Sequence, residues 1–144
     1  MLMEYGAGFP VFLESFPPAA ELPYLSAVAA LDRFWTEAHI ALDEPALERW
    51  SGFPLRPHAA ARWAWFPLPA YTIWSRNREE RSDLGDIEWR AEGALITRPR
   101  DAVQWIGLDE SEYAFLDGIA STTPPSIARL LEAGAFAEST LTED

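Results

Sequence analysis

The apolar residues of this chain change their spacing near Asp86, and this change limits the folds that the chain can adopt. Before Asp86 they recur every three or four residues, as on one face of an α-helix. After it they alternate, as on a half-buried β-strand. The sequence therefore predicts an α+β protein, in which a helical N-terminal unit is followed by a small winged-helix-like unit of three antiparallel strands and two helices.

The helical spacing is clearest after Pro23, a residue that is tolerated in the first turn of a helix. The apolar side chains that share one helical face are Tyr24, Leu25, Val28, Leu31, Trp35, Ala38 and Leu42. We also expect a short helix over 46–50, an extended segment over 53–69 and one more helical turn over 71–76. Residues 1–75 are thus predicted to form the helical unit.

The segment that follows is strongly charged, and we interpret residues 76–85 as a linker between the two units. Beyond it, alternating apolar residues predict strands over 87–91, 94–98 and 103–108. Gly93 is expected to form the turn between the first two strands. Five large aromatic residues are expected to lie mostly in cores: Trp63, Trp65, Trp74, Trp89 and Trp105.

Two helices are predicted after the strands. Asp109 has the chemistry of an N-cap residue, and Glu112 three positions later completes a capping-box pattern. A final helix is expected over 126–133, where Gly134 ends it. The second unit therefore spans 86–136, and residues 137–144 form a tail.

Composition excludes several classes of site. The chain has no cysteine and only two histidines, His39 and His58, so we expect neither a metal nor another cofactor. The net charge is −12 and all eleven basic residues are arginines, which makes nucleic acid an improbable partner. No apolar run is long enough to span a membrane, and no signal-peptide pattern is present, so we expect a cytoplasmic protein that does not bind membranes.

Known catalytic motifs are absent, and the candidate groups have simpler interpretations. His39 is either a general base paired with Asp43 or a half-buried helix residue, and we favour the second interpretation because no nucleophile stands beside it. The acids that follow Leu108 are explained by the start of a helix, where the helix dipole favours negative charge. The arginines of the linker are either a phosphate site or a solvated surface, and we favour the surface: Arg76, Arg78 and Arg81.

The third predicted strand, 103–108, lies at an edge of the sheet and lacks the lysines and prolines that usually protect such edges. An open edge can accept a strand from another chain, with the backbone amide of Ile106 as one donor. A covered edge is the alternative interpretation. We also expect that Leu25, Val28 or Trp35 leaves apolar surface exposed, or buried in a homodimer contact.

Several short motifs resemble the HvfC/BufC family, which carries the older label "putative DNA-binding domain". They begin with Tyr5-Gly6 and Phe9-Pro10 and continue with Pro23-Tyr24-Leu25 followed by Asp32 and His39. Arg56-Pro57-His58 and Tyr71-Thr72-Ile73-Trp74 also match, so the resemblance covers about residues 2–136. Members of that family carry further helical sequence before the Tyr5-Gly6 position, so the resemblance implies that this chain lacks the N-terminal helices.

The resemblance implies a protein without catalytic activity that presents a precursor peptide to a maturation enzyme of the multinuclear non-haem iron type. In related peptide-recognition elements the peptide lies as an added strand in a groove between the third strand and the last helix. Carried onto this chain, the peptide-binding residues are Val103, Gln104, Trp105, Ile106, Gly107, Ile127, Leu130 and Leu131. The alternative function is that of a DNA-binding transcriptional regulator.

Overall fold

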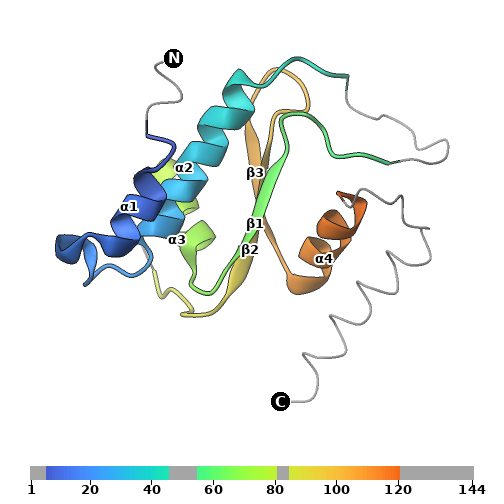
Figure 1. Cartoon of the computed structure of the whole chain (residues 1–144). Helices are drawn as coiled ribbons and strands as arrows, with labels where there is room; N and C mark the ends of the chain where they lie inside the picture. Colours follow the sequence, from blue (N-terminus) through green and yellow to red (C-terminus); the bar gives the residue numbers. More distant parts are fainter. Residues whose placement is uncertain (1–5, 46–54, 81–84, 121–144) are drawn as a thin grey trace.

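The computed structural model describes residues 6–45, 55–80 and 85–120, and it has the predicted α+β class (Figure 1). The helices are α1 (Phe9–Ser15), α2 (Leu25–Ile40), α3 (Ala70–Arg78) and α4 (Glu110–Ile119), and a short 3-10 helix (Pro17–Ala19) follows α1. The strands are β1 (Arg62–Phe66), β2 (Glu92–Thr97) and β3 (Gln104–Leu108). The helices predicted after Pro23 and after Asp109, and the turn over 71–76, are therefore present.

The three strands form an antiparallel sheet in the order β1-β2-β3. The register aligns Trp63 with Leu95, and Leu95 with Ile106. The first strand expected at 87–91 is wrong, because that segment lies outside the sheet and its Trp89 is exposed. The segment that replaces it, β1, carries apolar side chains on both faces, which suits a strand that helices cover from both sides. The sheet therefore contains residues from both predicted units.

Helices cover both faces of the sheet (Figure 1). Helices α2 and α3 pack on one face, and α4 packs on the other. Because side chains alternate along a strand, Ala94 and Ile96 of β2 point toward α2 and α3, and Leu95 between them points toward α4. The main core lies on the α2 side, and its fully or nearly fully buried members include Leu31, Ala38, Trp74, Ala94 and Ile96.

Gly93 does not form a turn, as the sequence suggested, but lies inside β2 opposite Trp65 and Leu108. A Cβ atom at this position would lie 3.0 Å from the Leu108 Cβ and 3.0 Å from the Trp65 Cε3. Glycine is therefore needed here because neighbouring side chains occupy the space above the strand, and not because the backbone bends.

The predicted linker, 76–85, begins inside a helix, because α3 continues to Arg78. The predicted helices over 46–50 and 126–133 and the tail over 137–144 lie outside the described residues. Among the described helices, none has the length and apolar character needed to cross a membrane.

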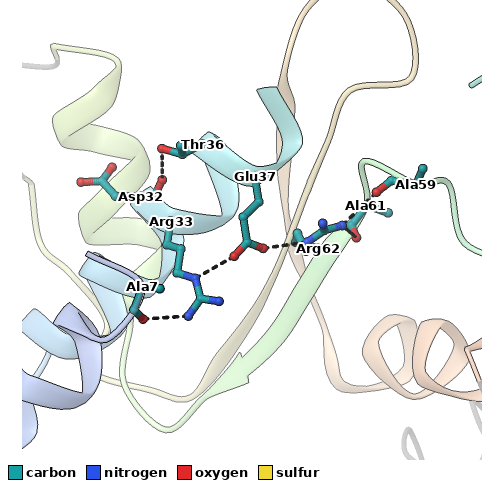
Figure 2. Close-up of polar contacts among 8 residues, drawn as sticks. All are labelled: Ala7, Asp32, Arg33, Thr36, Glu37, Ala59, Ala61 and Arg62. Atoms are coloured by element: carbon teal, nitrogen blue, oxygen red, sulfur yellow. Dashed lines mark hydrogen bonds and ion pairs between the residues drawn. The ribbon is translucent and has the colours of Figure 1, made fainter. Parts of the chain in front are cut away.

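A polar network joins the start of the described chain to α2 and β1 (Figure 2). The Arg33 Nε donates to Glu37 Oε1 at 2.6 Å, and the Arg62 Nε donates to Glu37 Oε2 at 2.8 Å. Arg33 also donates to the Ala7 carbonyl at 2.9 Å, and Arg62 donates to the carbonyls of Ala59 and Ala61. One carboxylate, that of Glu37, thus aligns two arginines that hold α1, α2 and β1 together.

We expect Glu37→Gln to lower the free energy of unfolding at neutral pH by about 1–2 kcal/mol, because both arginines lose their anionic partner. Burial raises the pKa of Glu37, but the hydrogen bonds from Arg62 and Arg33 outweigh it, and the net pKa lies below its ordinary value of 4.5. The stabilisation is therefore complete above that value and disappears as the pH falls through the lower pKa of the folded state. Urea denaturation of both proteins should show a difference in the free energy of unfolding at neutral pH that becomes smaller in acid. A difference that does not change with pH would contradict this assignment.

Candidate functional site

The strand predicted to bind a peptide, β3, forms an edge of the sheet. It pairs with β2 along one side, and no described strand pairs with its other side. The predicted residues Val103 to Gly107 lie on or immediately before this strand. The residues predicted for the opposite wall, Ile127, Leu130 and Leu131, lie outside the described residues.

The predicted β3 residues do not all offer their side chains to a ligand. Val103 and Trp105 are half-buried and pack against the core under α2 and α3. The Trp105 ring meets the Trp74 ring edge to face, with centroids 5.4 Å apart, so Trp105 has a packing role. Gln104 and Ile106 point toward the other face, where both are exposed, and Ile106 leaves 52% of its surface in contact with solvent.

Tyr71 of α3 covers one position of the β3 edge. A Cβ atom on Gly107 would lie 3.0 Å from the Tyr71 Cε1, so only glycine fits beneath this ring. Burial is the main cause that raises the pKa of Tyr71, the negative charges of Glu79 and Glu92 raise it further, and a hydrogen bond from the Gly107 amide lowers it in part.

The register pairs Ile106 with Leu95 of β2. That the Ile106 amide is a donor at the free edge stays a prediction.

An open pocket of ≈ 720 Å³ lies beside the C-terminal end of β3. Its lining includes the rings of Trp65 and Tyr71, the end of β3 at Leu108, and the first residues of α4, Asp109 and Glu110. Glu92 also lines it and accepts hydrogen bonds from the Thr72 amide at 2.6 Å and the Thr72 hydroxyl at 2.9 Å. Sequence analysis missed Tyr71 and this pocket, although a glycine inside a strand, here Gly107, indicates a close approach by another group.

The acidic residues at the start of α4 form the predicted helix cap. The Asp109 carboxylate accepts from the Glu112 amide at 2.8 Å, and the Glu112 carboxylate accepts from the Asp109 amide at 2.9 Å. The hydrogen bond from the Glu112 amide is the largest cause that lowers the pKa of Asp109, followed by one from Ser111. These contacts account for both carboxylates as capping groups.

Both histidines take part in packing or hydrogen bonding. The His39 ring stacks on Trp35 with centroids 5.2 Å apart, and Asp43 forms an ion pair of 2.7 Å with Arg98. The His58 Nδ1 accepts from the Ala60 amide at 3.1 Å, which leaves Nε2 to donate to the Glu44 carbonyl at 2.7 Å. His39 is thus a helix residue, as favoured from the sequence, but it is exposed and not half-buried, and Asp43 pairs with Arg98 and not with His39.

Arg78 is exposed, as the sequence suggested, but it belongs to α3 and its guanidinium packs on aromatic rings. Its guanidinium lies 4.1 Å from the centre of the Trp35 ring, and Trp74 and Trp105 lie within 5.8 Å of it. Asp32 forms an ion pair with Arg78 at 3.6 Å and accepts from the Trp74 indole at 2.7 Å. Arg78 therefore joins α2, α3 and β3 through cation–π contacts, which no local sequence pattern indicates.

The described residues thus place one continuous candidate site on the molecule, formed by the open edge of β3, the exposed Ile106 and the pocket beside Tyr71. Among the residues that the structure describes, no group of three or more His, Asp or Glu side chains is arranged to hold a metal ion. No protein-family model, no curated protein and no solved structure matches the chain.

Proposed function

We propose that this chain is a binding protein without catalytic activity, which captures an extended precursor peptide along β3 and presents it to a maturation enzyme of the multinuclear non-haem iron type. The observation that carries the proposal is the position of β3 at an edge with no partner strand among the described residues. The choice of peptide and enzyme rests on the resemblance of the sequence motifs to the HvfC/BufC family.

The backbone of β3 supplies the first part of the recognition. Along its free side β3 offers backbone amides and carbonyls that can pair with an added strand. The Tyr71 ring packs over Gly107, so the added strand would pair along the earlier part of β3 and end where it meets Tyr71. The packing of Trp105 against Trp74 holds this part of the edge in place before a peptide binds.

Side chains supply the specificity. Alternate residues of an added strand would face Ile106, whose exposed aliphatic surface favours an apolar partner. The neighbouring pocket is lined by three acidic residues, Glu92, Asp109 and Glu110, and by one arginine, Arg90. This excess of negative charge favours a basic side chain in the peptide. Residues 101–144 contain nine acidic residues and one arginine, so a basic peptide would also be attracted at a distance.

Replacing Ile106 by lysine should weaken peptide binding about tenfold or more. The lysine removes the apolar contact, repels a basic peptide and leaves the strand ladder intact, because only the side chain changes. The probe is a fluorescein-labelled synthetic peptide in which apolar and basic residues alternate, and fluorescence anisotropy measures its dissociation constant. The matched control is Leu42→Lys, which adds the same charge at an exposed position just after α2.

The control variant should bind the peptide nearly as well as the wild type, and both variants should keep the wild-type melting temperature. Equal binding by Ile106→Lys and the wild type would contradict the β3 site. A gene neighbourhood that encodes neither a precursor peptide nor a maturation enzyme would contradict the function. Binding of a mixed-sequence DNA duplex at physiological salt would favour the transcriptional regulator instead.

A further inference from the structure

Helix α1 has apolar side chains on two sides, and the structure covers only one of them. Pro10 and Leu13 are buried, and α1 packs against α2. Phe9, Phe12 and Phe16 lie along another side and are 52%, 50% and 39% exposed. A helix that is apolar on two sides is typical of helices that are covered on both. Exposed apolar surface was expected at Leu25, Val28 or Trp35 of α2, and these residues are half-buried. The larger exposed apolar surface lies on α1.

The three phenylalanines form a continuous surface, which we call the Phe face. The centroids of the Phe9 and Phe12 rings are 6.2 Å apart, and those of the Phe12 and Phe16 rings are 4.9 Å apart. Since an aromatic side chain has about 150–250 Å² of surface, the three half-exposed rings present roughly 300 Å² to solvent. Contiguous apolar patches of this size on a monomer often serve in binding.

Hydrogen bonds hold the Phe face in position before any partner arrives. The Ser26 hydroxyl on α2 contacts the Pro10 carbonyl at 2.8 Å and the Glu14 carboxylate at 3.3 Å. Arg33 on α2 donates to the Ala7 carbonyl just before α1. Helix α1 is thus tied to α2 near both of its ends, so that binding to the Phe face would not require ordering of this helix.

The charges around the Phe face indicate the kind of partner. The chain carries a net charge of −12, and four of the six carboxylates in residues 6–45 pair with arginines: Asp32, Glu37, Asp43 and Glu44. The other two, Glu14 and Glu21, are exposed, and Glu14 lies on the side of α1 that meets Ser26 of α2. A partner with basic residues beside its apolar side chains would complement this field.

A second copy of the chain does not fit these features. A stable dimer buries about 800 Å² on each partner, which is more than twice the area of the Phe face. A contact between two copies would also bring together two chains with a net charge of −12 each. The limited area and the negative field instead match one face of a single short helix.

We propose that the Phe face docks an amphipathic helix of a partner protein, which presents apolar side chains at helical spacing and arginine or lysine residues beside them. The docked helix would pack on the free side of α1, so that α1 becomes the middle helix of a three-helix layer. This interaction does not depend on peptide binding at β3, because no residue is shared between the two surfaces.

The test uses a synthetic helical peptide with leucines on one face and arginines on the other, labelled for fluorescence anisotropy and titrated with the full chain. Phe12→Gln should weaken binding about tenfold, because it removes the central ring of the surface. The matched control is Val11→Gln, since Val11 is 67% exposed on α1 but points away from the phenylalanines, and it should bind like the wild type. Ile106→Lys should also leave binding of this peptide unchanged.

Three results would overturn the proposal. The first is that Phe12→Gln and Val11→Gln weaken binding of the peptide equally, or that neither weakens it. Either outcome would mean that only general charge attraction operates. The second is a dimer of the free chain, seen by sedimentation velocity, that Phe12→Gln dissociates, because a second copy would then be the occupant. The third is binding of the wild type, but not of Phe12→Gln, to neutral phosphatidylcholine vesicles. A version of the peptide with glutamates in place of arginines should bind at least about tenfold more weakly than the arginine version.

Discussion

Ile96→Ala should lower the free energy of unfolding by about 3 kcal/mol, a large part of the stability of a domain of this size. Ile96 lies in the central strand β2, has no surface in contact with solvent, and packs in the core with Leu31, Ala38 and Trp74. Truncation to alanine removes buried methyl groups and leaves a cavity that helices on a twisted sheet fill only in part. Urea denaturation monitored by far-UV circular dichroism measures the loss.

The matched control is Ile106→Ala, which makes the same chemical change in the neighbouring strand of the same sheet. Ile106 is half exposed, so the loss there should stay within about 0.5 kcal/mol. Losses of similar size at the two positions would contradict the assignment of Ile96 to the core and of Ile106 to the surface of an edge strand.

Gly93→Ala should destabilise the protein by about 1–3 kcal/mol, although it adds only one methyl group. That methyl group would lie 3.0 Å from both the Leu108 Cβ and the Trp65 Cε3, and 3.3 Å from the Leu108 carbonyl oxygen. The Leu108 contacts belong to or lie next to the backbone of a paired strand, so they cannot move aside without disturbing the β2–β3 pairing. Because Leu108 and Trp65 also line the pocket, the substitution should weaken peptide binding as well.

Gly8→Ala is the control for this substitution. A Cβ atom at Gly8 would have nothing within 4 Å, and its φ of −88° is accessible to alanine. The stability should therefore change by no more than about 0.5 kcal/mol. A Gly93→Ala protein as stable as Gly8→Ala would show that the sheet has more room above β2 than the structure indicates.

Much of the fold follows from local patterns. The repeat of apolar residues after Pro23 predicted α2, and the Asp109–Glu112 pattern predicted the start of α4, where both capping hydrogen bonds are present. These predictions succeeded because the hydrogen bonds of a helix and its cap join residues that are close in the sequence. The prediction of β3 over 103–108 succeeded for a similar reason, since alternation is visible within a single strand.

The strand expected at 87–91 failed for a reason that lies outside the segment. Both 62–66 and 87–91 contain alternating apolar residues, and neither pattern states which of the two pairs with β2. The choice depends on the helices that cover the sheet, since β1 buries side chains against α2 on one face and against α4 on the other. Packing of this kind joins residues far apart in the chain, so sequence spacing does not record it.

The candidate site divides in the same way. Composition shows that the chain is strongly acidic. Local patterns predicted that β3 is an apolar strand at an edge without protective charges and that a helix begins at Asp109, because these properties belong to single segments. The packing of the whole chain was needed to show that Tyr71 covers Gly107, that Trp105 faces the core while Ile106 faces solvent, and that three phenylalanines of α1 remain exposed. Each of these depends on which face of an element a distant helix covers, and that is settled by the packing of the whole chain.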